Sequence, residues 1–168
     1  MLQRLGASER SILIAQSNLA ATYYKLLRLE QAVNALRDVY SGFLKLEPTT
    51  DEKTLQAANN YASCLIRLER FKEAKALVRR TIPVARSVLG EGHRLTLKMR
   101  KIYARALYNY DDATLDDLRE AVATLAEIER TARRVFGGAH PDTVYIEQSL
   151  RNARAKLRAR ETPSPRGA

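Results

Sequence analysis

The sequence predicts an all-α fold, an α-solenoid of antiparallel helix pairs. Glycine and proline are scarce, with 7 and 5 residues in a chain of 168, and these are the residues that helices tolerate least. Apolar residues recur at spacings of three and four, as on the buried face of a helix. The same arrangement of residues also returns along the chain, and a period of roughly 20–50 residues is typical of a solenoid.

Two columns of alanine define the repeat. Equivalent positions in the first helix of each unit are Ala20, Ala62 and Ala104, and those in the second helix are Ala32, Ala74 and Ala121. The step is 42 residues, except that it is 47 between the last two alanines of the second column. The five extra residues fall around 109–117, where we expect a loop insertion. Because alanine is small, each column lets two antiparallel helices approach closely.

The segments between units share a second signature. Residues 89–96 and 136–143 both read apolar-Gly-x-x-His-x-x-Thr. The glycines suit helix ends, and Pro141 suits the first position of the next helix. We expect His93 and His140 to be turn and capping residues rather than metal ligands or catalytic bases. Pro83 falls inside a second helix, which it should bend or end early because it lacks a backbone donor.

These columns divide the chain into units. Residues 1–8 are expected to be the end of a preceding second helix, because Leu5 and Gly6 lie 84 residues before Leu89 and Gly90. The expected array spans residues 9–160, with repeats at about 9–50, 51–92 and 93–139 and a closing helix at 140–160. Residues 161–168 are expected to be a disordered tail.

The expected closing helix differs from the other first helices. In it the alanine column becomes Arg151, and Arg154 and Arg158 continue the same face. A terminal helix needs polar residues there, whereas an interior helix needs apolar residues to receive the next unit. We therefore expect the array to end at this helix. The other end has no matching polar face, which favours a longer array upstream or a cover over that face.

The columns resemble the tetratricopeptide repeat, a two-helix unit with Leu/Tyr-Ala in its first helix and Ala in its second. The 42-residue period, with Leu-Gly-x-x-His-x-x-Thr between units, is similar to the kinesin light chain form of this repeat. The resemblance covers about residues 5–158. It implies a right-handed superhelix and a role in protein–protein interaction as a scaffold or adaptor, although such arrays occur in proteins with many functions.

In tetratricopeptide arrays the first helices line a concave groove that holds a peptide, and the resemblance carries these positions over by column. The predicted groove residues are Asn18, Tyr24, Lys25, Asn59, Asn60, Arg67, Lys98, Lys101, Arg105 and Tyr108. An asparagine amide both donates and accepts hydrogen bonds, so it suits a peptide backbone. Lys98, Lys101 and Arg105 stand at i, i+3 and i+7, which puts three cations on one helix face. The prediction is a groove for an acidic peptide.

The formal net charge of +10 leaves other hypotheses open. It favours acidic partners, but it also fits an ordinary solubilising surface. Nucleic acid binding is one alternative, suggested by the basic residues Arg151, Arg154, Lys156, Arg158 and Arg160. Against it, the aromatic residues Phe43, Tyr61 and Tyr103 fall in core columns rather than on a stacking platform. The other alternative is a structural spacer inside a larger protein.

Catalytic and cofactor motifs are missing from the sequence. It has no phosphate-binding glycine loop, nucleophile elbow or paired-histidine motif, so we expect no enzyme, cofactor or metal site. The aspartates at 111, 112, 116 and 117 lack the spacing that wraps calcium. The single cysteine, Cys64, is expected to be a small buried or half-buried side chain. No apolar run suits a signal peptide or a membrane span, so we expect a cytoplasmic protein. The sequence does not indicate its oligomeric state.

Overall fold

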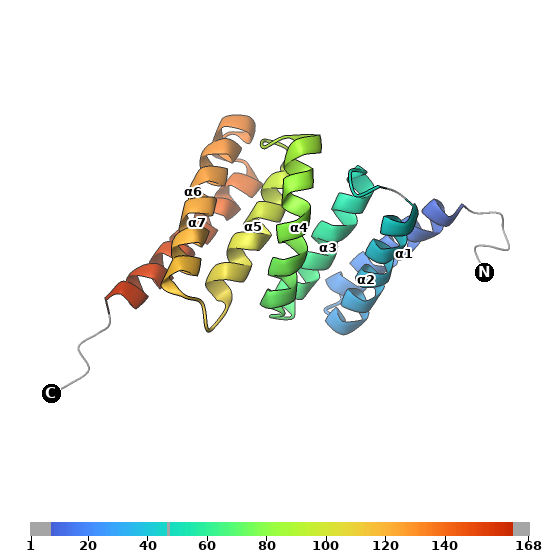
Figure 1. The fold of residues 1–168 in the computed structure, drawn as a ribbon, viewed down its shortest axis with the longest axis horizontal. Coiled ribbons are helices and arrows are strands. Elements are labelled where there is room, and N and C mark those ends of the chain that lie inside the picture. Colours follow the sequence, from blue (N-terminus) through green and yellow to red (C-terminus); the bar gives the residue numbers. More distant parts are fainter. Residues whose placement is uncertain (1–7, 47, 163–168) are drawn as a thin grey trace.

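The computed structural model describes residues 8–46 and 48–162, and within them the chain forms helices and no strands. The helices are α1 (Glu9–Lys25), α2 (Leu29–Leu46), α3 (Glu52–Arg67), α4 (Phe71–Leu89), α5 (Arg94–Asn109), α6 (Leu115–Phe136) and α7 (Pro141–Glu161). They stand side by side in a row from α1 and α2 at one end to α6 and α7 at the other (Figure 1). The expected all-α solenoid is confirmed.

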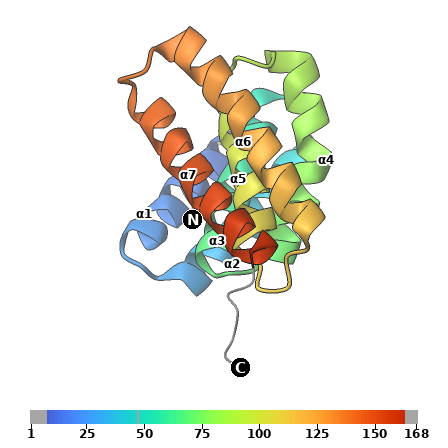
Figure 2. The same cartoon turned by 90° about the vertical axis from the view of Figure 1, so that its left-hand side faces the viewer.

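The helices form two layers. Each even-numbered helix packs against the helices before and after it, while α3 also packs directly against α5, and α5 against α7. In the view along the row, α1 and α7 lie on one side and α4 on the other (Figure 2). The layer of α1, α3, α5 and α7 is therefore the layer of first helices, where the sequence predicts the groove. None of the described helices is long and apolar enough to cross a membrane.

Both alanine columns lie at the centres of the helix contacts. All six alanines of the two columns have no exposed surface: Ala20, Ala62, Ala104, Ala32, Ala74 and Ala121. Larger side chains such as Leu65, Leu107 and Leu125 fill the space around them. In a core of this density a larger residue at an alanine position would force neighbours off their rotamers, at a cost of about 1–3 kcal/mol. The columns thus set the spacing between helices.

The two histidines cap successive first helices. His93 and His140 have the same backbone angles, φ −66° and ψ 136°, at the positions that precede α5 and α7. The His93 Nδ1 accepts a hydrogen bond from the Leu95 amide at 3.3 Å, and the His140 Nδ1 accepts one from the Asp142 amide at 3.1 Å. The predicted turn and capping role is therefore confirmed.

The inserted residues of the third unit lengthen both a loop and a helix. The loop after α5 covers residues 110–114, two residues more than the loop 68–70 after α3. Helix α6 begins six residues before Ala121, whereas α4 begins three residues before Ala74, so the start of α6 is three residues longer. Thr114 starts α6 with a capping box, in which its hydroxyl accepts from the Asp117 amide and the Asp117 carboxylate accepts from the Thr114 amide. Asp117 also binds Lys75 of α4 at 2.9 Å.

Pro83 does not end its helix, so that part of the expectation is wrong. Helix α4 continues through Pro83 to Leu89. Buried residues on both sides, Val78 and Ala85 among them, pack against the neighbouring helices. Their burial outweighs the backbone hydrogen bond that proline removes.

The two ends of the array are partly described. Ser8 caps the start of α1 by accepting a hydrogen bond from the Ser11 amide at 3.2 Å. Helix α7 ends at Glu161, one residue beyond the expected closing helix. The expected preceding helix (1–8) and the expected tail (161–168) are therefore wrong at Ser8 and Glu161, and residues 1–7 and 163–168 lie outside the described residues.

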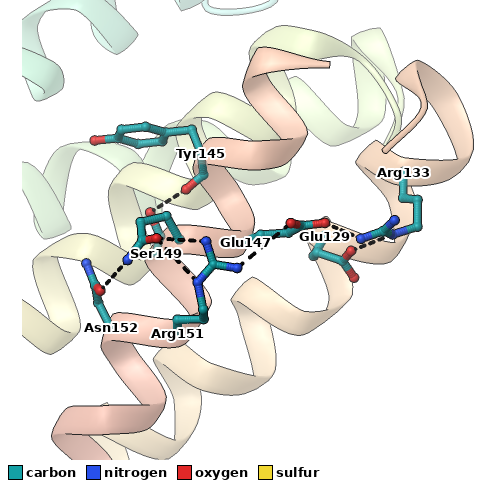
Figure 3. A network of polar contacts seen from close by, with 8 residues as sticks. Glu129, Arg133, Tyr145, Glu147, Ser149, Arg151 and Asn152 are labelled. Atoms are coloured by element: carbon teal, nitrogen blue, oxygen red, sulfur yellow. Dashed lines mark hydrogen bonds and ion pairs between the residues drawn. The ribbon is translucent and has the colours of Figure 1, made fainter. Parts of the chain in front are cut away.

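Helix α7 is fastened to α6 by a polar network at its exposed face. Glu147 of α7 lies between Arg133 of α6 and Arg151 of its own helix and pairs with both (Figure 3). Arg133 also pairs with Glu129 at 2.8 Å, and Arg151 donates to the Gln148 side chain at 2.7 Å. Arg151, which replaces alanine in the first column, is exposed. Its charge is therefore engaged by its own helix.

Candidate functional site

A cavity opens in the layer of first helices. Its volume is about 460 Å³, and it is lined by Tyr24, Asn59, Ser63, Ile66, Lys98, Lys101, Ile102, Arg105, Pro141, Asp142 and Tyr145. These residues come from α1, α3, α5 and α7, so all four first helices share one hollow. The volume lies in the range of ligand pockets, roughly 300–1,000 Å³.

Half of the predicted groove residues line this cavity. They are Tyr24, Asn59, Lys98, Lys101 and Arg105. The other five lie outside its lining: Asn18, Lys25, Asn60, Arg67 and Tyr108. Asn18 and Lys25 are exposed on α1, whereas Tyr108 is only 4% exposed and borders a different cavity beside α7.

The three cations of α5 meet in the cavity without a carboxylate partner. Helix α5 carries five Lys and Arg residues and no Asp or Glu. Arg94 pairs with Asp142, and Arg100 pairs with Glu91 and Glu127. Across residues 8–46 and 48–162, no carboxylate lies within ion-pair distance of Lys98, Lys101 or Arg105. The i, i+3, i+7 spacing thus gathers three cations that have no ion-pair partner among the described residues.

Lys101 is the most enclosed of these cations. Its Nζ lies 4.1 Å from the centre of the Tyr145 ring, in cation–π contact. Burial lowers the pKa of Lys101 to about 8, and the nearby charges of Arg105 and Lys98 add to this shift while Asp142 opposes it. Removal of water and repulsion between like charges both disfavour the ammonium form. An anion that entered the cavity would stabilise the ammonium form and so offset both effects.

Tyr145 of α7 contacts two of the three cations. Its hydroxyl accepts a hydrogen bond from Arg105 Nη1 at 3.1 Å, while its ring faces Lys101. Tyr145 is 45% exposed, so much of its surface remains free for contact. The sequence prediction missed this residue. Since Tyr145 lies 47 residues after Lys98, the repeat column itself was the signal that could have found it.

Among the described residues, Asp142 is the only acidic one in the lining. Burial alone would raise the pKa of Asp142, but the hydrogen bond from Arg94 and the charges of Lys98 and Lys101 bring this pKa below its usual 3.8. The carboxylate is therefore ionised at neutral pH. Because Arg94 also binds this carboxylate, Asp142 balances only part of the positive charge that a ligand would meet.

Asn59 lines the cavity and carries a buried hydrogen-bond acceptor. The residue is 6% exposed, and its Oδ1 finds no donor among the residues that the structure describes. Its Nδ2 donates to the Asn60 Oδ1 at 3.4 Å, and that oxygen also accepts from Gln56 at 2.8 Å. A buried carbonyl without a donor is costly, and because this oxygen has almost no accessible surface, a ligand would reach it only if the side chain turned towards the cavity.

An aromatic wall closes the α1 side of the cavity. The Arg67 guanidinium lies 5.1 Å from the centre of the Tyr24 ring and stacks over it. Arg67 is exposed, whereas Tyr24 is half-buried and lines the cavity. Arg67 therefore supports the wall instead of forming part of the lining.

Cys64 is fully buried, its Sγ donates to the Leu29 carbonyl at 3.6 Å, and burial raises the pKa of its thiol to about 11. A thiol with such a pKa is a poor nucleophile. Among the described residues, no group of His, Cys, Asp and Glu side chains has the arrangement of a metal site.

Comparisons with known proteins support the repeat architecture. Residues 54–95 match the family model of the tetratricopeptide repeat. The sequence matches no curated protein. Among solved structures, a single-substitution variant of a kinesin light chain-type protein from Podospora anserina with nearly identical TPR-like repeats has a TM-score of 0.74. It is 21% identical, over 92% of this chain and 71% of that one.

Two further structures show the same similarity. The unsubstituted Podospora protein has a TM-score of 0.67 at 20% identity, covering 94% of this chain and 81% of that one. BtubC (BKLC) from P. vanneervenii has a TM-score of 0.59 at 16% identity, covering 96% of this chain and 70% of that one. At these identities the similarity establishes a common fold.

Proposed function

We propose that this chain, a tetratricopeptide repeat protein with kinesin light chain-like units, binds an acidic peptide segment of a partner protein in the cavity between α1, α3, α5 and α7. Repeats of this family generally mediate protein–protein interaction. The observation that carries the proposal is the group of three cations, Lys98, Lys101 and Arg105, that share one cavity without a carboxylate partner. We call these three residues the basic trio.

The chemistry of the trio suits an anionic side chain. Charge-assisted hydrogen bonds contribute about 1.5–3 kcal/mol each, and they are strongest where water is excluded. Lys101 is half-buried, and Arg105 offers a planar fork of donors. An Asp, a Glu or a phosphorylated residue would bond to both.

The repeat architecture supports a peptide as the carrier of that anion, because repeats of this family generally mediate protein–protein interaction. The aromatic residues of the core columns offer little stacking surface to a nucleic acid, because Phe43 is 3% exposed and Tyr61 and Tyr103 are half-buried. Tyr145 is 45% exposed, but its ring already contacts Lys101. These observations favour a peptide over nucleic acid.

Fluorescence anisotropy with fluorescein-labelled peptides of mixed Glu and Ser composition tests the proposal. The intact chain should bind them, and Lys101→Glu/Arg105→Glu should weaken binding by at least about tenfold, the loss of one charge-assisted bond. The matched control is Arg37→Glu/Lys45→Glu, which changes net charge equally at two exposed positions on α2. Melting curves would confirm that both variants are folded.

Two outcomes would contradict the proposal. Full affinity in Lys101→Glu/Arg105→Glu would remove the cavity as the site. Tighter binding to a single-stranded RNA of equal charge, weakened equally by both double variants, would favour a nonspecific basic surface instead, because such binding depends on net charge and falls steeply with salt.

A further inference from the structure

The basic trio gives its cavity a net positive charge that one carboxylate cannot balance. The cavity lining contains three cations and one acidic residue, Asp142, which leaves an excess of two positive charges. Asp142 is itself bonded to Arg94 from outside the lining. A bound Asp or Glu side chain supplies one negative charge, whereas a phosphomonoester carries about −1.5 to −2 at pH 7.

We propose that the group held by Lys98, Lys101 and Arg105 is a phosphomonoester on the partner peptide, as in a phosphorylated serine, threonine or tyrosine. This inference rests on the proposed function, since it assumes that a peptide occupies the cavity. It adds the chemical class of the anion. Unmodified acidic peptides then become weaker ligands of the same site.

The number of donors agrees with this charge count. The trio projects from one face of α5 over two turns, and each member has N–H donors that no carboxylate among the described residues accepts. A phosphomonoester has three terminal oxygens, so each cation can bind an oxygen of its own. A carboxylate has only two, and the third cation would remain repelled by its neighbours.

Tyr145 defines what the phosphoryl group would replace. The centre of its ring lies 4.1 Å from the Lys101 Nζ, and its hydroxyl lies 3.1 Å from the Arg105 Nη1. Both contacts are with neutral groups, so they leave the cationic charges in place. A dianion between α5 and α7 would exchange these contacts for charge-assisted bonds.

Burial of Lys101 supports a strongly charged ligand. Desolvation and the charges of Arg105 and Lys98 lower the pKa of its ammonium to about 8. A dianion at the trio raises this pKa again, so ligand binding near pH 8 must take up protons. Proton uptake can be measured separately from affinity, through the dependence of calorimetric heats on buffer ionisation.

The test compares degenerate peptide mixtures that differ only at one central residue. With the full-length chain, the affinity for the phosphoserine mixture should be at least about tenfold higher than that for the glutamate mixture. The serine mixture should have the lowest affinity of the three. Binding of the phosphoserine mixture at pH 8 should take up protons. Lys101→Gln/Arg105→Gln should lose this preference, whereas the control Arg37→Gln/Lys45→Gln should keep it.

Different results would overturn different parts of the inference. Equal affinity for the glutamate and phosphoserine mixtures would reject the phosphomonoester but leave the acidic-peptide function standing. Unchanged binding in Lys101→Gln/Arg105→Gln would reject the proposed site itself. Free O-phosphoserine and inorganic phosphate form the remaining arm. If either bound as tightly as the peptides, the ligand would be a small phosphate compound and the peptide-binding function would be rejected.

Discussion

Leu27 and Glu69 share a left-handed backbone conformation at equivalent positions of two successive units. They lie 42 residues apart and have φ angles of 60° and 58°. Each ends a first helix, and the next residue, Arg28 or Arg70, donates its amide back into the last turn at 2.9 Å. Glycine adopts this conformation without strain, whereas other residues pay about 1–2 kcal/mol.

Replacing Leu27 by glycine should therefore stabilise the chain. We expect Leu27→Gly to raise the free energy of unfolding by roughly 0.5–1 kcal/mol, the strain relieved less the entropy that glycine adds to the unfolded state. The side chain is 65% exposed, so few contacts are lost. The control is Leu26→Gly, which is 62% exposed but has φ −80° and should destabilise. Urea unfolding measures both, and equal effects would contradict the argument.

Gly90 and Gly137 present the reverse case. They follow α4 and α6 with φ of 92° and 87° and ψ near 160°, a region that is almost restricted to glycine. A Cβ at either position would meet no atom within 4 Å. We expect Gly90→Ala and Gly137→Ala each to cost about 1–3 kcal/mol of stability through backbone strain alone. Thermal unfolding that matched wild type would show that these turns relax freely.

Periodic features of the fold could be predicted from sequence. The buried alanines Ala62 and Ala74 and the capping residue His93 recur at fixed steps, and a repeat must bury or cap equivalent positions alike. The left-handed turns could not be predicted, because Leu27 and Glu69 are not glycines. In these turns the closing hydrogen bonds and the packing of the flanking helices override local preference.

The candidate site was predicted only in part, for a related reason. Helical spacing placed Lys98 and Lys101 on one face, and the structure brings both into one cavity. That spacing does not show which charged side chains form ion pairs between helices. Arg94 meets Asp142 across 48 residues of sequence, so only the fold shows which cations remain without a carboxylate. The burial of Asn59 likewise depends on how α3 packs against α5.

Acid should weaken the fold partly through Glu127. Arg100, only 8% exposed in its side chain, donates to Glu127 at 2.6 Å, and this bond lowers the pKa of Glu127 below its ordinary 4.5. A carboxyl with a lowered folded-state pKa adds stability above its unfolded pKa and loses it as pH falls through the folded value. Urea unfolding between pH 6 and 3 should therefore show a shallower loss in Glu127→Gln than in wild type.

A double-mutant cycle isolates this effect. In an Arg100→Met background the donor is gone, so Glu127→Gln should no longer change the slope of stability against pH. If the slope difference persisted without Arg100, another neighbour would have to be responsible for the shift.

Lys101 should affect the stability of the fold at alkaline pH. Its pKa is about 8 in the folded chain against an ordinary 10.5, so between these values the unfolded chain binds a proton that the folded chain does not. Stability therefore rises with pH there, by at most about 1.4 kcal/mol per pH unit. We expect wild type to gain stability over Lys101→Met as the pH rises from 7 to 10, measured by urea unfolding. Parallel curves for the two proteins would show that Lys101 is solvated like a surface lysine.

The affinity for the ligand should depend on the same Lys101 proton, but it should fall with rising pH, whereas stability rises. A phosphoserine peptide interacts with the ammonium form of Lys101, and that form disappears as the pH rises through about 8. Wild-type affinity should therefore fall by roughly tenfold between pH 7 and pH 9, where the phosphoryl group itself no longer titrates. Lys101→Arg keeps its charge over this range, so its affinity should stay flat.

Anisotropy titrations at constant ionic strength measure this dependence. A wild-type affinity that did not change with pH would mean that the ligand does not contact Lys101, whereas an equal fall in Lys101→Arg would place the titrating group elsewhere. If affinity and stability changed with pH around the same midpoint, the Lys101 amine would be the titrating group in both measurements. The burial that makes the Lys101 ammonium unfavourable without a ligand would then also strengthen its attraction for an anion, because charges interact more strongly where water is excluded.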